Sequence, residues 1–170
     1  MTISSPISIN QLAQAVALTI GLASGAAALD QDQDLRIVPQ LVVGTSGFEP
    51  GLALEWRAPA NPMVILRPEL LISEDGQLGG GGALLVGLDQ HLELPARQAV
   101  AIGPRVVYHH ADDSSWEADV MATWSFDLSQ DDRAWRHAIG ALAAVGVVRD
   151  RENHDFDLGA SAGVFYAFGF

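Results

Sequence analysis

The chain has 170 residues, which is enough for one domain with a substantial core and too few for two comparable ones. Its formal net charge is −12 and its nine basic residues are all arginine, which excludes the basic surface of a nucleic-acid-binding protein. Cysteine is absent, so disulfides and thiol chemistry are excluded. After residue 34, no charge-free run approaches the roughly 20 residues of a membrane helix. If this part of the chain spans a membrane, it does so with strands.

The N-terminal segment is uncharged through residue 29. Leu12–Leu22 forms an apolar run, and the small residues of Ala23–Ala28 follow it, which is typical of a secretory signal peptide cleaved after Ala28. Because a signal normally begins with Lys or Arg and this segment has neither, an uncleaved N-terminal helix packed on or in the domain is the alternative. We therefore divide the chain into residues 1–28 and one domain over residues 29–170.

The last strand of that domain shows the clearest pattern. From Phe156 to Phe170, one alternating register is wholly apolar, and the other is mostly small or polar. A period of two predicts a strand with different surroundings on its two faces. The same alternation predicts eight strands in all: Leu35–Val43, Leu52–Ala58, Val64–Ser73, Ala83–Leu94, Val100–Tyr108, Trp116–Leu128, Trp135–Val148 and Phe156–Phe170.

The predicted connections alternate in length. Those after the first, third, fifth and seventh strands are expected to be the longer ones, including Glu74–Gly82 with the flexible glycine run Gly79–Gly82. Pro68 and Pro104 weaken the prediction of the third and fifth strands, because proline has no N–H to donate to the backbone hydrogen bonds between strands. The seventh segment is apolar enough that a helix could be drawn there, but its glycines favour a strand.

A chain that ends on an aromatic residue after an alternating strand resembles the small bacterial outer-membrane β-barrels of the OmpA and OmpX type. The resemblance implies an all-β, eight-stranded antiparallel up-and-down transmembrane barrel of porin-like fold in a Gram-negative outer membrane. It also implies assembly by the barrel-assembly machinery through the C-terminal strand. The expected partners are outer-membrane lipids, with lipopolysaccharide as a candidate and no protein partner identified. The alternative is a soluble lipocalin-like barrel, periplasmic or secreted, whose apolar face points inward onto an apolar ligand.

Three features favour lipid over that alternative. The polar face is rich in small residues, which suits a narrow eight-stranded interior, and the apolar face of the last strand has no polar interruption. The aromatic residues also sort toward the two ends of the strands, as at two water–lipid interfaces. The expected interface aromatics are Trp56, Tyr108, Trp116, Trp124, Phe126, Trp135, Phe156, Tyr166, Phe168 and Phe170.

Charged and amide side chains on the polar face would then line the lumen. Isolated charges in a low-dielectric interior are costly, so they must pair with one another or stay hydrated. We expect a network that fills the lumen rather than an open pore, with a proton- or ion-conducting path as the alternative. The predicted network comprises Arg36, Gln40, Glu55, Arg57, Arg67, Glu69, Arg105, Glu117, Asp119 and Asp157.

No catalytic motif, resident metal or cofactor is predicted. His110, Asp112 and Asp113 are weak metal candidates, because a solvated loop explains the same residues. The run 149–155 could meet lipopolysaccharide phosphates through Arg149 and Arg151, but a solvated hairpin tip is the preferred interpretation. Outer-membrane lipid A deacylases are similar in size and strand number, but His137 lacks the adjacent serine of their strand motif. A lipid-modifying hydrolase is therefore the minor alternative to a non-enzymatic role.

Overall fold

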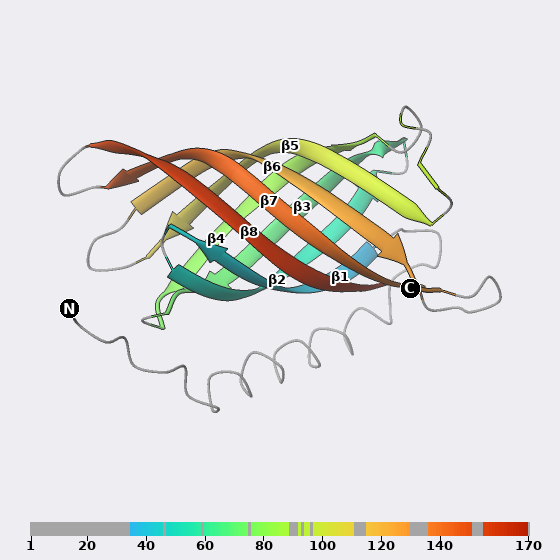
Figure 1. Ribbon diagram of the computed structural model, residues 1–170, viewed down its shortest axis with the longest axis horizontal. Coiled ribbons are helices and arrows are strands. Elements are labelled where there is room, and N and C mark those ends of the chain that lie inside the picture. Colours follow the sequence, from blue (N-terminus) through green and yellow to red (C-terminus); the bar gives the residue numbers. More distant parts are fainter. Residues whose placement is uncertain are drawn as a thin grey trace.

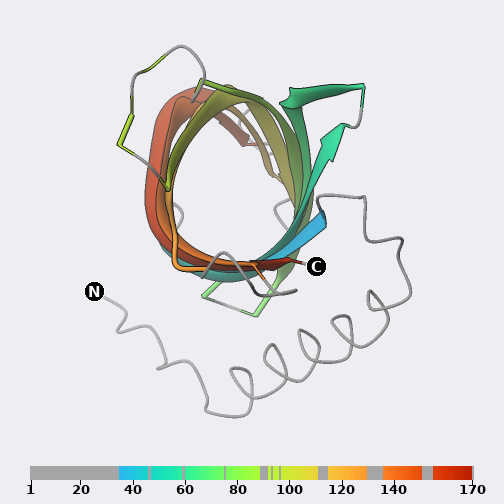
Figure 2. The ribbon, with the colours of Figure 1, turned by 90° about the vertical axis from the view of Figure 1, so that its right-hand side faces the viewer.

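The computed structural model describes residues 35–45, 47–58, 60–74, 76–88, 92, 94–95, 97–110, 115–129, 136–150 and 155–169. They form the strands β1 (Leu35–Gly44), β2 (Gly47–Ala58), β3 (Asn61–Ile72), β4 (Leu78–Gly87), β5 (Gln98–His109), β6 (Ser115–Asp127), β7 (Arg136–Asp150) and β8 (Phe156–Gly169). Each strand pairs with the next, and β1 pairs with β8, so the sheet closes into a barrel (Figures 1 and 2). Among the described residues, no helix is long and apolar enough to cross a membrane.

The predicted all-β, eight-stranded antiparallel barrel is confirmed. All eight strand pairs are antiparallel, and the β6–β7 and β7–β8 ladders run without a register shift over their whole length. The apolar seventh segment is a strand, and Pro68 and Pro104 lie within β3 and β5. In a closed barrel every strand has two neighbours, so a strand that loses one ladder bond to proline is still held on both edges. The predicted segment 1–28, with Trp135 and Phe170, lies outside the described residues.

The glycine run was wrongly predicted to be a flexible loop. Gly79–Gly82 lies inside β4, which spans Leu78–Gly87 rather than Ala83–Leu94. A Cβ atom added at Gly81 would come within 2.8 Å of the Cα atom of Val107 on β5. Glycine is therefore required here because β4 and β5 approach too closely for a side chain. Residues 88–97, which include the predicted end of this strand, form a connection instead.

The connections do not follow the predicted lengths. One end of the barrel, which we call the first rim, carries the connections 45–46, 73–77, 110–114 and 151–155. The other end, the second rim, carries residues 59–60, 88–97 and 128–135, together with Leu35 and Gly169. The first rim was expected to have the longer connections. The strand ends at this rim extend beyond the residues that alternation indicated, so its connections are short, and the connections 88–97 and 128–135 of the second rim are longer. β2 begins at Gly47, whose φ of +109° suits glycine.

The two faces of the barrel wall differ sharply in chemistry. Large apolar side chains on the outward face are solvent-exposed in the isolated barrel, including Val120 (54%), Val145 (64%) and Leu158 (83%). The inward face buries a mixture of small, apolar and charged residues, with Arg67 0% and Arg105 2% exposed. Because charged side chains are almost never fully buried unless they are paired, the buried arginines must have partners inside the barrel.

One aromatic side chain of the inward face packs on a glycine. Phe165 on β8 lies opposite Gly140 on β7, and the Cζ of Arg67 lies 5.4 Å from the centre of the Phe165 ring. A Cβ atom added at Gly140 would come within 2.7 Å of Cε2 of Phe165 and would also meet the backbone oxygen of Trp124. The absence of a side chain at Gly140 therefore makes the space that this ring occupies.

We expect Gly140→Ala to destabilise the folded barrel by about 1–3 kcal/mol, because the added methyl group must displace Phe165 and the neighbouring backbone. Urea unfolding of the protein in detergent or lipid measures the loss. Gly80→Ala is the matched control, since its nearest neighbour would be Cδ2 of Leu70 at an ordinary 3.5 Å. Equal stability of the two variants would contradict the packing described for Phe165.

Candidate functional site

The barrel interior holds an ion-pair cluster centred on Arg105 of β5. The Nε atom of Arg105 donates to both carboxylate oxygens of Asp119 at 3.1 and 3.0 Å, and these two residues lie directly opposite each other on β5 and β6. Its Nη2 atom donates to Glu117 at 3.1 Å, and its Nη1 atom lies 3.5 Å from Glu69. One guanidinium group thus pairs with carboxylates from β6 and, across the lumen, from β3, which is the arrangement that makes a buried arginine tolerable.

A second cluster lies between this one and the second rim. Arg67 of β3 donates to Glu55 on β2 and to the amide oxygen of Gln40 on β1. The Nε2 atom of Gln40 then donates to Glu69 at 2.8 Å, and Glu69 also contacts Arg105. The amide of Gln40 therefore connects the two arginine clusters into one network, which joins side chains of β1, β2, β3, β5 and β6 across the lumen.

Two residues near the first rim extend this network beyond the predicted set. The Nδ1 atom of His109 lies 3.6 Å from Glu49 on β2, and its Nε2 atom lies 3.7 Å from Glu117 on β6. Sequence reasoning ended the fifth strand at Tyr108 and began the second at Leu52, so both His109 and Glu49 were missed. A usable signal was present, because each residue continues the inward register of its strand.

Beside the network, the described residues enclose a small cavity in the lumen. This cavity near the second rim, lined by Arg36, Glu55, Arg57 and Phe165 among others, has a volume of about 20 Å³. That is room for about one water molecule. Inward-facing small residues lie opposite members of the network and make space for them: Gly51 opposite Gln40, Ala53 opposite Glu69, Ala83 opposite Arg67, and Gly146 opposite Asp119.

The predicted lumen residues all lie in the inward register, but their burial differs. Asp157 is exposed at the first rim, where it lies opposite Val148, so it stands outside the buried network. Arg36 and Arg57 are partly buried near the second rim. The buried members of the predicted set are Gln40, Arg67, Glu69, Arg105, Glu117 and Asp119.

The aromatic side chains gather near the two rims. Near the first rim, the rings of Tyr108 and Trp116 lie 4.8 Å apart. Near the second rim, the rings of Tyr166 and Phe168 lie 6.2 Å apart, and the indole nitrogen of Trp124 donates to Gln98 at 3.0 Å. The predicted aromatics Trp56 and Phe126 lie on the same outward face near the second rim, opposite Leu66 and Ile139.

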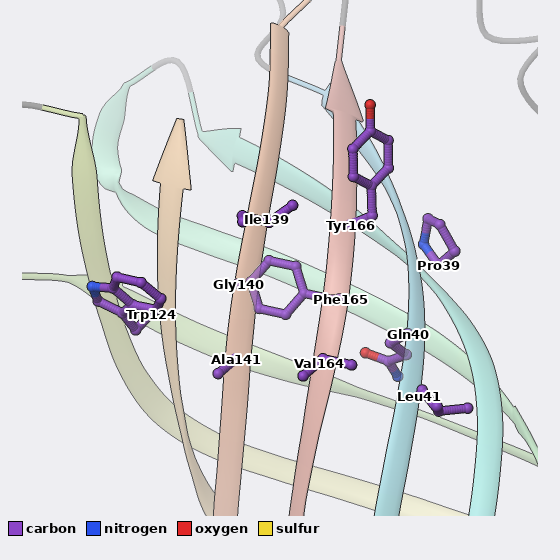
Figure 3. Close-up of a pocket in the computed structure, with 10 residues that line it drawn as sticks. All are labelled: Pro39, Gln40, Leu41, Trp124, Ile139, Gly140, Ala141, Val164, Phe165 and Tyr166. Atoms are coloured by element: carbon purple, nitrogen blue, oxygen red, sulfur yellow. The ribbon is translucent and has the colours of Figure 1, made fainter. Parts of the chain in front are cut away.

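The outward face is hollowed beside the second-rim aromatics (Figure 3). This groove has a volume of about 630 Å³ and lies over β1, β6, β7 and β8, where the outward residue Ala141 presents little side chain. Its walls are apolar, with Trp124 and Tyr166 on either side (Figure 3). The one amide among its lining residues, Gln40, is already bonded to Arg67 and Glu69 in the lumen. The indole nitrogen of Trp124 and the hydroxyl of Tyr166 are likewise engaged, by Gln98 and His137, so the polar groups of the lining already have partners within the protein.

The predicted metal candidates and His137 do not form a catalytic or metal-binding arrangement among the described residues. His110 is exposed just past β5, while Asp112 and Asp113 lie outside the described residues. No group of three or more metal-ligating side chains occurs within the part of the chain that the structure describes. His137 faces outward, and its Nδ1 atom lies 2.6 Å from the hydroxyl of Tyr166, a residue that sequence reasoning did not pair with it.

Comparison with known proteins does not assign the chain to a family. A scan against protein-family models, a search of curated proteins and a search of solved structures each returned no match. The resemblance to outer-membrane barrels therefore rests on the pattern of the strands and on the architecture.

Proposed function

We propose that this protein is a transmembrane β-barrel of the small bacterial outer-membrane type. Its lumen is closed by its own charged side chains, and its role is that of a structural or interaction protein rather than that of a solute pore. The apolar outward wall would contact lipid, with the aromatic residues at its two interfaces. No catalytic residue or cofactor enters this proposal.

One observation carries the proposal. Among the described side chains that face outward from the eight strands, a single one, Arg149, belongs to the strongly charged types Asp, Glu, Lys and Arg. The inward face, by contrast, carries charged side chains on β1, β2, β3, β5, β6, β7 and β8. Because a charged side chain at the lipid midplane costs several kcal/mol, an outward face of this kind suits lipid, and in water it would be a very large apolar surface.

The interior supports the second half of the proposal. A carrier of the lipocalin kind needs an apolar cavity of ligand size, whereas here the charged face points inward and the described lumen cavity measures about 20 Å³. An open solute channel needs a continuous passage, and the network of Arg67 and Arg105 lies across the barrel in its path.

Reconstitution into planar lipid bilayers tests both halves together. We expect the protein to insert and to show little or no steady conductance, because the Arg67 and Arg105 clusters fill the lumen. The double variant Arg67→Ala, Arg105→Ala removes the two largest fully buried side chains among the described residues and should raise the conductance of those barrels that insert. A large, stable channel in the wild-type protein would refute the closed lumen, and failure to insert would refute the membrane barrel.

A further inference from the structure

One row of outward side chains near the first rim combines three aromatic rings with the single outward charge. The row runs across four neighbouring strands in direct register: Tyr108 on β5, Trp116 on β6, Arg149 on β7 and Phe156 on β8. We call these four residues the rim row. Arg149 thus lies between two aromatic neighbours, Trp116 on one side and Phe156 on the other.

The geometry holds the guanidinium group of Arg149 on the outer surface. Its Cζ atom lies 5.3 Å from the centre of the Phe156 ring, which is within the range of a cation–π contact. Trp116 and Phe156 are 52% and 65% exposed, so the space above the row is open. Within the described residues Arg149 forms no ion pair, although the chain as a whole carries an excess of acidic residues. Its donors are therefore available to an external anion.

The position of the row indicates which anion that would be. Aromatic side chains at the end of an apolar membrane wall lie at the level of the lipid headgroups. Arginine presents a planar fork of donors that matches a phosphate group, and its apolar stem can lie along the lipid while the charge reaches the interface. A phosphate at this depth would accept charge-assisted hydrogen bonds from Arg149, while the acyl chains attached to it would contact Trp116 and Phe156.

We propose that the rim row binds the phosphate group of a membrane lipid through Arg149. This inference rests on the proposed membrane barrel and specifies one of its lipid contacts. Two sources share the chemistry: a phosphorylated glycolipid such as lipid A, if the first rim faces the outer leaflet, or a glycerophospholipid. The wall below the row is apolar in either case, so the headgroup phosphate is the recognised feature.

Native mass spectrometry of the full chain in detergent micelles tests this inference. Bound lipid is counted after titration with lipid A, with phosphatidylglycerol, and with diacylglycerol, which has acyl chains and no phosphate. We expect Arg149→Gln to weaken binding of a phosphate lipid about tenfold, since it removes a charge-assisted bond. Arg149→Lys should lose less, because it keeps the charge without the planar fork. Arg136→Gln is the matched control, because it removes the same charge from the opposite end of β7.

The three lipids and the control variant distinguish the possible results. A loss with Arg149→Gln for lipid A alone, or for phosphatidylglycerol alone, supports the site and identifies the lipid. An equal loss with Arg136→Gln would overturn it, and so would unchanged binding by Arg149→Gln or a parallel loss for diacylglycerol. A wild-type protein that is folded in micelles but binds neither phosphate lipid contradicts this inference alone. A protein that does not enter micelles as a folded barrel contradicts the proposed function instead.

Discussion

Replacing Arg105 with methionine should destabilise the barrel by about 3–5 kcal/mol, the largest effect of any single substitution in the lumen. Arg105 is 2% exposed and pairs with Glu69, Glu117 and Asp119, so its removal leaves three buried carboxylates facing one another. Most of this loss of stability is the cost of leaving buried carboxylates without a positive partner. The net contribution of the ion pairs to the stability of the wild-type barrel is smaller. Urea-induced unfolding in lipid vesicles or detergent, followed by tryptophan fluorescence, gives the difference in the free energy of unfolding.

Two further variants separate charge from packing. Adding Asp119→Asn to Arg105→Met removes one of the stranded charges and should recover part of the stability, since the two residues belong to one network. Arg136→Gln removes an exposed arginine of the inward register and should change stability little. If Arg105→Met cost no more than Arg136→Gln, the ion-pair network would not be holding the interior.

The second large effect concerns the outward wall. Val145 lies near the middle of β7, is 64% exposed and pairs with Val120 on one side and Ala160 on the other. If this face contacts lipid, Val145→Arg should destabilise the barrel by about 2–4 kcal/mol when it is folded into bilayers. If the same face contacted water, an exposed valine could become arginine with a change within about 0.5 kcal/mol.

Leu92 provides the matched control for that substitution. It is also an exposed apolar residue, at 42%, but it lies in the connection 88–97 at the second rim rather than in the wall. Leu92→Arg should leave the free energy of unfolding nearly unchanged. A small effect of Val145→Arg, comparable to that of Leu92→Arg, would contradict a lipid-facing wall.

The sequence predicted the architecture because alternation persists over all eight segments. A period-2 pattern fixes which residues share a face, so Arg67, Arg105 and Asp119 could be placed on one face of the wall before any coordinates. The small residues on that face, and not the alternation itself, favoured its inward direction. The glycines of the apolar seventh segment favoured a strand over a helix there. Alternation indicates the end of a strand less well, because a glycine run such as Gly79–Gly82 weakens the pattern without ending the strand.

The site was predicted only in part, for the same reason. His109 and Glu49 continue the inward register, but each lies beyond the last strong apolar residue that marked its strand. The pairing of Arg105 with Asp119 follows from the register of the β5–β6 hairpin, and the turn between those strands has no sequence signal that sets this register. The bridging role of Gln40 between Arg67 and Glu69 depends on the closure of β1 with β8 and on side-chain rotamers, which a periodic pattern does not encode.

The outward position of Arg149 could also be read from alternation, although the sequence alone placed it at a solvated hairpin tip. β7 continues to Asp150, so Arg149 belongs to the barrel wall, and the ladder brings it between Trp116 and Phe156. The difference between a loop residue and a wall residue changes its chemistry, because only the latter lies at a fixed depth beside aromatic rings.

Membrane fractionation combined with heat-modifiable gel mobility tests the central claim most directly. The account predicts that the protein sediments with the membranes, resists extraction by alkaline buffer and needs detergent to stay dispersed. It also predicts that an unheated sample, whose barrel stays folded, migrates differently from a boiled one. A protein that remains in the soluble fraction as a folded monomer in plain buffer would contradict the membrane barrel.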